Sequence, residues 1–171
     1  KQFVLRQTLH ETVLPPITFF EHTIDFSHSD TWDERDMQMW MGSEANDAHF
    51  PGTLARLTRQ KQYCHYPPMV EPHIPACIRE TAGQNTFVSH SRMSEVIAQL
   101  KLDLMAARQL NKYYRALIFC DYHAEIDAMR LKVAEEVLQD ASKVAVFDGR
   151  IGSADKEAIL RNDDIVVLIM Q

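Results

Sequence analysis

The 171-residue sequence has few of the residues that build special frameworks: three cysteines, five glycines and seven prolines. An odd number of irregularly spaced cysteines argues against a disulfide framework and favours a reducing, intracellular compartment. So little glycine excludes collagen-like and flexible low-complexity chains. No apolar run approaches the roughly 18 residues of a transmembrane helix, so we expect no membrane partner. Residues 1–6 lack a secretory apolar region, and the missing initiator Met suggests a piece of a longer protein.

Basic charge is also scarce overall. The net charge of −6 argues against a globally basic nucleic-acid binder. The charge is uneven, however, because residues 51–120 carry nine basic and four acidic side chains. This basic middle is compatible with a local anion-binding surface and equally with a solvated helix face.

Proline density divides the chain. Four prolines fall in a stretch that we predict to be a mostly irregular connector, residues 66–88. Before it, in residues 1–65, we predict a strand at 17–26 and helices at 31–41 and 54–63. Leu54 and Leu57 are expected on the apolar side of the second helix.

Three short apolar runs alternate with helical periodicity after the connector, in residues 89–171. The pattern predicts a helix at 91–110, strands at 115–120, 143–147 and 165–170, and crossover helices at 122–139 and 153–161. Strands that are apolar on both faces indicate an α/β fold whose parallel sheet is covered on both sides. Because no helix follows the last strand, we expect further structure beyond Gln171.

No phosphate-binding loop of either common type is present. The nearest feature is Gly149-Arg150-Ile151-Gly152, which leaves a strand and enters a helix. Glycines permit close backbone approach to a ligand, and a helix N-terminus favours an anion. The alternative is a tight turn that needs glycine for its geometry.

A metal site is a further hypothesis. Cys64, His65, His73 and Cys77 are potential zinc ligands, but their spacing is not the usual paired arrangement. Cys120 ends an apolar run and is predicted to be a small core residue. No nucleophile and base constellation can be assembled from the sequence.

Six segments occur in an order that is informative. They are Val4–Thr8 with Val13–Pro16, Leu57–Pro67, Ser91–Met93, Arg115–Cys120, Val146–Arg150 and Ile165–Met170. Together they resemble the junction between the two RecA-like lobes, and the start of the second lobe, in Swi/Snf-type DNA-translocating ATPases of helicase superfamily two. In that family the fourth segment is the motif IV strand, the fifth is the D-G segment, and the sixth leads into motif V.

The resemblance implies a partial RecA-like, three-layer parallel sheet preceded by a helical insertion and one N-terminal strand. It implies a fragment of a nuclear, ATP-dependent DNA translocase or chromatin-remodelling helicase. ATP and Mg²⁺ would be bound by lobe regions outside this fragment, which would have no catalytic residues, metal or cofactor of its own. The implied partners are double-stranded DNA and the remainder of the lobes. The DNA-facing positions carried over are Asp121, Tyr122, His123, Gly149 and Arg150.

Two alternatives stay open. The sequence departs from the family pattern at Gln7, at His10 and at Asp155-Lys156. These departures favour a non-catalytic interaction module that retains a degenerate helicase lobe. The other alternative is a metal-stabilised binding domain built on residues 64–77.

Overall fold

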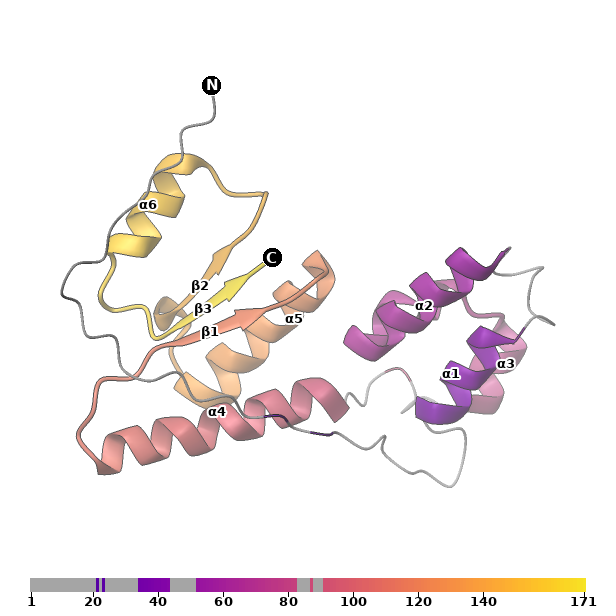
Figure 1. Ribbon diagram of the computed structural model, residues 1–171, viewed down its shortest axis with the longest axis horizontal. Coiled ribbons are helices and arrows are strands. Elements are labelled where there is room, and N and C mark those ends of the chain that lie inside the picture. The colour runs from indigo at the N-terminus through magenta and orange to yellow at the C-terminus, as the bar shows by residue number, and fades with distance from the viewer. Residues whose placement is uncertain (1–20, 22, 24–33, 44–51, 83–86, 88–90) are drawn as a thin grey trace.

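The computed structural model describes residues 21, 23, 34–43, 52–82, 87 and 91–171. The strand predicted at 17–26 lies outside the described residues, apart from residues 21 and 23. Figure 1 shows a group of helices beside a three-stranded sheet that carries its own helices.

The helical part contains α1 (Glu34–Gly42), α2 (Thr53–His65) and α3 (Ala76–Ala82). The helices predicted at 31–41 and 54–63 are thus confirmed, with shifted ends. A separate apolar core forms here from Met37, Met41, Tyr63, Val70, Ile74 and Phe87.

The prediction for the apolar side of α2 was wrong. Leu54 and Leu57 are 79% and 56% exposed, whereas Arg56 and Tyr63 are buried. Residues 56 and 63 lie seven apart, two turns along one helical face, and that face is the one that packs. The Arg56 guanidinium donates a hydrogen bond to the Thr53 hydroxyl at 3.4 Å.

The connector is more regular than predicted. It contains two 3₁₀ turns, η2 (Pro67–Met69) and η3 (Glu71–His73), followed by α3. The prolines do not break these elements, because they stand at the first two positions of the turns and directly before α3. A proline at the start of a helical turn lacks only an N–H that would have no partner there.

The C-terminal part is an α/β unit, as predicted. It contains α4 (Ser91–Gln109), β1 (Ala116–Phe119), α5 (His123–Lys132) continued by the π-helix η5 (Val133–Leu138), the 3₁₀ turn η6 (Ala141–Lys143), β2 (Val144–Phe147), α6 (Ser153–Arg161) and β3 (Val167–Met170). The sheet order is β1-β3-β2 and both pairings are parallel. Parallel pairing of the three predicted strands is confirmed, with the last strand in the centre.

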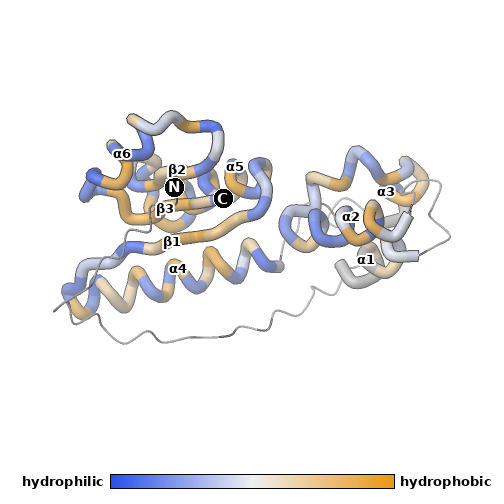
Figure 2. The backbone as a smooth tube through the Cα atoms, turned by 45° about the horizontal axis from the view of Figure 1, so that its top comes forward, coloured by the Kyte–Doolittle hydropathy of each residue, from blue (hydrophilic) through white to orange (hydrophobic). Residues whose placement is uncertain are grey.

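The two faces of the sheet are covered unequally. On one face α4 and α5 pack on the strands, and the core includes Met93, Ile97, Leu100, Ile126, Met129, Val133, Val144, Val167 and Ile169. On the other face lies α6, where Lys156 stands over the Phe147 ring. Leu117 and Phe119 of β1 point to this second face and are 61% and 65% exposed. The apolar strands and the helices on either side are visible in Figure 2.

Candidate nucleic-acid interface at the carboxyl edge of the sheet

All five carried-over positions lie at one edge of the sheet. Asp121, Tyr122 and His123 follow β1, and Gly149 and Arg150 follow β2. Since the strands are parallel, their carboxyl ends meet at the same edge, which is where open α/β sheets bind ligands. Gln171 follows β3 and joins the group.

Hydrogen bonds tie the first and third strand ends together. His123 Nε2 lies 3.0 Å from the Gln171 side-chain oxygen, and the Gln171 amide donates to the Asp121 carbonyl at 3.3 Å. The loop after β1 is therefore fixed against the end of the central strand.

Arg150 is held by two carboxylates. Its guanidinium donates two parallel hydrogen bonds to Asp127, at 2.9 and 2.8 Å, and contacts Asp148 at 2.7 and 2.6 Å. Asp148 is buried and also accepts the Arg150 backbone N–H at 2.8 Å. These hydrogen bonds lower the pKa of both carboxyls and raise the pKa of Arg150. Two negative charges thus surround one positive charge at this corner.

Asp121 meets a residue from the helical part. Lys61 Nζ of α2 lies 2.7 Å from the Asp121 carboxylate. Their hydrogen bond lowers the pKa of Asp121 and raises the pKa of Lys61. The first of the carried-over positions is consequently paired with a cation from a segment far upstream in the sequence.

Glu125, in the first turn of α5, is the buried centre of the same junction. It accepts the Asp121 backbone N–H at 3.1 Å, and its carboxylate lies 3.2 Å from His65 Nδ1 and 3.6 Å from Arg92. A carboxylate in a first helical turn also complements the helix dipole. Glu125 therefore joins α2, α4 and α5 at one point.

The His65 ring lies among three charged side chains. Its Nδ1 lies 2.6 Å from Arg92 Nη1 and 3.2 Å from the Glu125 carboxylate, and its Nε2 lies 3.6 Å from the Asp121 carboxylate. The His65 ring also packs edge-on against Tyr122, with centroids 5.4 Å apart.

Gly149 does not need to be glycine for backbone geometry. A turn is present at residues 149–150, but among the described glycines only Gly52 has a positive φ, so this turn does not use a conformation reserved for glycine. A Cβ placed on Gly149 would meet no atom within 4 Å. The backbone here is exposed and open to an approaching group.

The four potential zinc ligands are not brought together. Within the described ranges no group of three or more His, Cys, Asp or Glu side chains is arranged to hold a metal ion. His65 is turned to Glu125 and Arg92, and Cys77 is exposed. Cys120 is buried, as predicted, and burial raises its thiol pKa to about 12, which makes it inert.

Sequence reasoning missed Lys61, Arg92, Glu125, Asp127 and Gln171 at this edge. Glu125 had a usable signal, because an acidic residue early in a predicted helix is a capping candidate. The others have no local pattern, since their partners lie between 23 and 60 residues away.

Neither the protein-family models nor the curated proteins searched contain a match to this chain. Of the helices in the described part, none is both long and apolar enough to cross a membrane.

Proposed function

We propose that this chain belongs to an ATP-dependent DNA translocase of the Swi/Snf type, in which it forms the start of the second, RecA-like lobe. One observation carries the proposal. Lys61 and His65, from the segment Leu57–Pro67 of the resemblance, contact Asp121, which directly follows the motif IV-like strand. Two segments of the resemblance that are far apart in the sequence therefore meet, at the edge where a parallel sheet binds ligands. A nuclear location is part of the same proposal.

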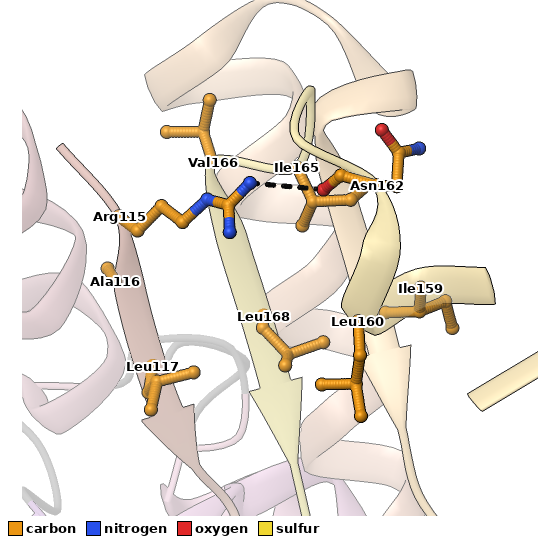
Figure 3. A pocket seen from close by; sticks show the side chains of 9 residues that line it. All are labelled: Arg115, Ala116, Leu117, Ile159, Leu160, Asn162, Ile165, Val166 and Leu168. Atoms are coloured by element: carbon orange, nitrogen blue, oxygen red, sulfur yellow. Dashed lines mark hydrogen bonds between the residues drawn. The ribbon is translucent and has the colours of Figure 1, made fainter. Parts of the chain in front are cut away.

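The second face of the sheet, which α6 covers only in part, supports the proposal that this chain is one part of a larger lobe. An apolar hollow of about 160 Å³ lies between α6 and strands β1 and β3. Figure 3 shows Leu117, Leu160 and Leu168 around it, with Arg115 hydrogen-bonded to the Asn162 carbonyl above. Parallel sheets are normally covered on both faces. The remainder of the RecA-like lobes is the partner we propose for this face.

ATP and Mg²⁺ do not fit the described residues. The carboxylates Asp121, Asp127 and Asp148 are each bound to a Lys or Arg side chain, and the described part holds no acidic cluster arranged for a metal. We assign no step of hydrolysis to this chain and place nucleotide binding in the remainder of the lobes.

DNA would be met by the open backbone at the carboxyl edge. The exposed turn at Gly149 leads into the N-terminus of α6, and backbone N–H groups at such a position suit a phosphate. Contacts of this kind position DNA without specifying sequence. Arg150 can contribute its positive charge to DNA binding only if a phosphate replaces one of its two carboxylate partners. Asp127 is the partner that a phosphate can replace, because it is exposed and Asp148 is buried.

That competition defines the test. In the protein that contains this chain, Asp127→Asn removes one carboxylate from Arg150 and should strengthen binding to a DNA duplex severalfold at low salt. Glu157→Gln is the matched control, because Glu157 is an exposed acidic residue of α6 paired with Arg161 and the charge change is the same. Binding is measured by anisotropy over a range of salt, where each phosphate contact contributes about 0.9 to the slope. Equal effects of the two substitutions would remove the DNA-facing assignment.

The pairing of Arg150 with Asp127 and Asp148 favours a second candidate, a non-catalytic interaction module. In that module the paired charges of the carboxyl edge would be structural: those of Arg150 would fix the end of the sheet, and Lys61 with Asp121 would hold the helical part on it. DNA-stimulated ATP hydrolysis by the whole protein distinguishes the candidates: the translocase has it and the module does not.

A further inference from the structure

The opposite, amino edge of the sheet has a cavity that is lined by apolar and positively charged side chains. A cavity of about 240 Å³ lies between the end of α4, the loop before β1, and the chain around η5 and η6. Leu104, Ala107, Leu138 and Val166 form an apolar floor, and Tyr113 and Tyr114 form a wall. The remaining three lining residues, Arg108, Lys112 and Lys143, are cations.

These cations are not neutralised as those at the carboxyl edge are. Within the described residues neither Arg108 nor Lys112 has an acidic partner. Lys143 lies 3.5 Å from Asp140, whose carboxylate already accepts the Ser142 N–H and hydroxyl. The rim therefore keeps most of its positive charge in a chain whose net charge is −6.

The cavity is held in shape before any ligand arrives. Asn111, with φ 50°, ends α4 in a Schellman motif, since its N–H bonds the Arg108 carbonyl and the Lys112 N–H bonds the Ala107 carbonyl. The hydroxyl groups of Tyr113 and Tyr114 are bound to the Asp163 carbonyl and to Asp103. A preformed cavity reduces the ordering cost of binding.

The size and chemistry of the cavity select one occupant. Small-molecule sites typically have about 300–1,000 Å³, so this cavity is too small for one but accepts an apolar side chain. The rim needs negative charge at a distance of one or two residues from that side chain. Nucleic acid supplies the negative charge, but the edges of its bases carry hydrogen-bonding groups for which the aliphatic floor has no side-chain partner.

We propose that this cavity binds an acidic peptide segment of a partner protein, with one aromatic or aliphatic side chain on the apolar floor and flanking carboxylates on Arg108, Lys112 and Lys143. The site is separate from the carboxyl edge and does not depend on the proposed function. Rim charges of this kind steer the partner, while the buried side chain supplies most of the affinity.

The test uses the full chain and a fluorescein-labelled peptide with one phenylalanine between two pairs of glutamates. Replacing the phenylalanine by serine should weaken binding about tenfold or more, because burial of that side chain is lost. The double variant Arg108→Glu with Lys112→Glu should weaken binding to a similar extent. Its control, Arg79→Glu with Arg130→Glu, changes the charge equally at exposed positions that do not line the cavity and should leave the affinity within about twofold.

A second variant checks the floor without changing charge. Ala107→Leu fills the cavity and should abolish the difference between the phenylalanine and serine peptides. Circular dichroism confirms that each variant folds. Equal binding of the two peptides to the wild-type chain would overturn the proposal. The proposal would also be overturned if binding of a DNA duplex depended on Arg108 and Lys112 while binding of the peptide did not, because the face would then be a nucleic-acid surface.

Discussion

The two edges of the same sheet use their charged residues in opposite ways. At the carboxyl edge Lys61, Arg92 and Arg150 each form an ion pair with a carboxylate. At the amino edge Arg115 and Lys143 are paired with Asp163 and Asp140, but Arg108 and Lys112 are left without acidic partners among the described residues. Paired charges give a defined geometry and contribute little field, whereas unpaired charges attract an anion. The charges of the carboxyl edge therefore fix the positions of the surrounding elements, whereas those of the amino edge are available to attract an anionic ligand.

The largest effect is expected at Glu125. Glu125→Leu removes the buried acceptor of the Asp121 N–H and leaves His65 and Arg92 without their carboxylate. Loss of one partner from a buried, charged network costs about 3 kcal/mol. Urea unfolding should show that decrease, while Arg108→Gln at the amino edge should change stability by less than about 0.5 kcal/mol. A similarly small loss of unfolding free energy in both variants would mean that the paired charges of the carboxyl edge do not stabilise the fold.

Asp148→Ala should have the next largest effect. Its side chain is buried and accepts both the backbone and the side chain of Arg150. Removing an acceptor of charged hydrogen bonds costs about 2 kcal/mol. A thermal melt of the variant beside Lys112→Gln, which should melt like the wild type, measures the contrast.

Acid should weaken the ion pairs of the carboxyl edge. The pKa values of Asp121, Asp127 and Asp148 are lowered by Lys61 and Arg150. A folded-state pKa below the unfolded value of about 3.9 means that the stabilisation is complete above that pH and is lost as the pH falls through the folded pKa. Unfolding free energy should therefore drop below about pH 4, and the drop should be smaller in Asp148→Asn. An unchanged slope in that variant would contradict the assignment.

Gly149→Ala should have the smallest effect on stability. The position has ordinary φ and open space, so alanine is accommodated and restricts the unfolded chain, with a gain of about 0.5 kcal/mol. Marked destabilisation of the variant would show that the turn needs glycine after all.

The sequence predicted the part of the fold that depends on periodicity. The strands at 116–119 and 144–147 and the long helix from Ser91 have strong, unbroken patterns, and each was found. The buried face of α2 was not predictable from periodicity, because it contains the charged residue Arg56 while Leu54 and Leu57 are exposed. The regular structure of the connector does not follow from its proline content, because proline breaks the interior of a helix but is accommodated where a helical turn starts.

The candidate site was predictable only in its location. Residues that follow parallel strands share an edge, so Asp121 and Arg150 could be placed at the same edge. Their partners could not, since Asp127 and Lys61 reach them through the packing of α5 and α2. The charge state of the edge, which decides what it can bind, depends on those partners.

Hydrogen–deuterium exchange of the protein that contains this chain, with and without a DNA duplex at low salt, tests the central claim most directly. Contact of DNA with the carboxyl edge should slow exchange of the amides at 121–125 and 149–152 and leave those at 108–114 unchanged. Slowed exchange at 108–114 alone, or at neither edge, would contradict the proposed interface.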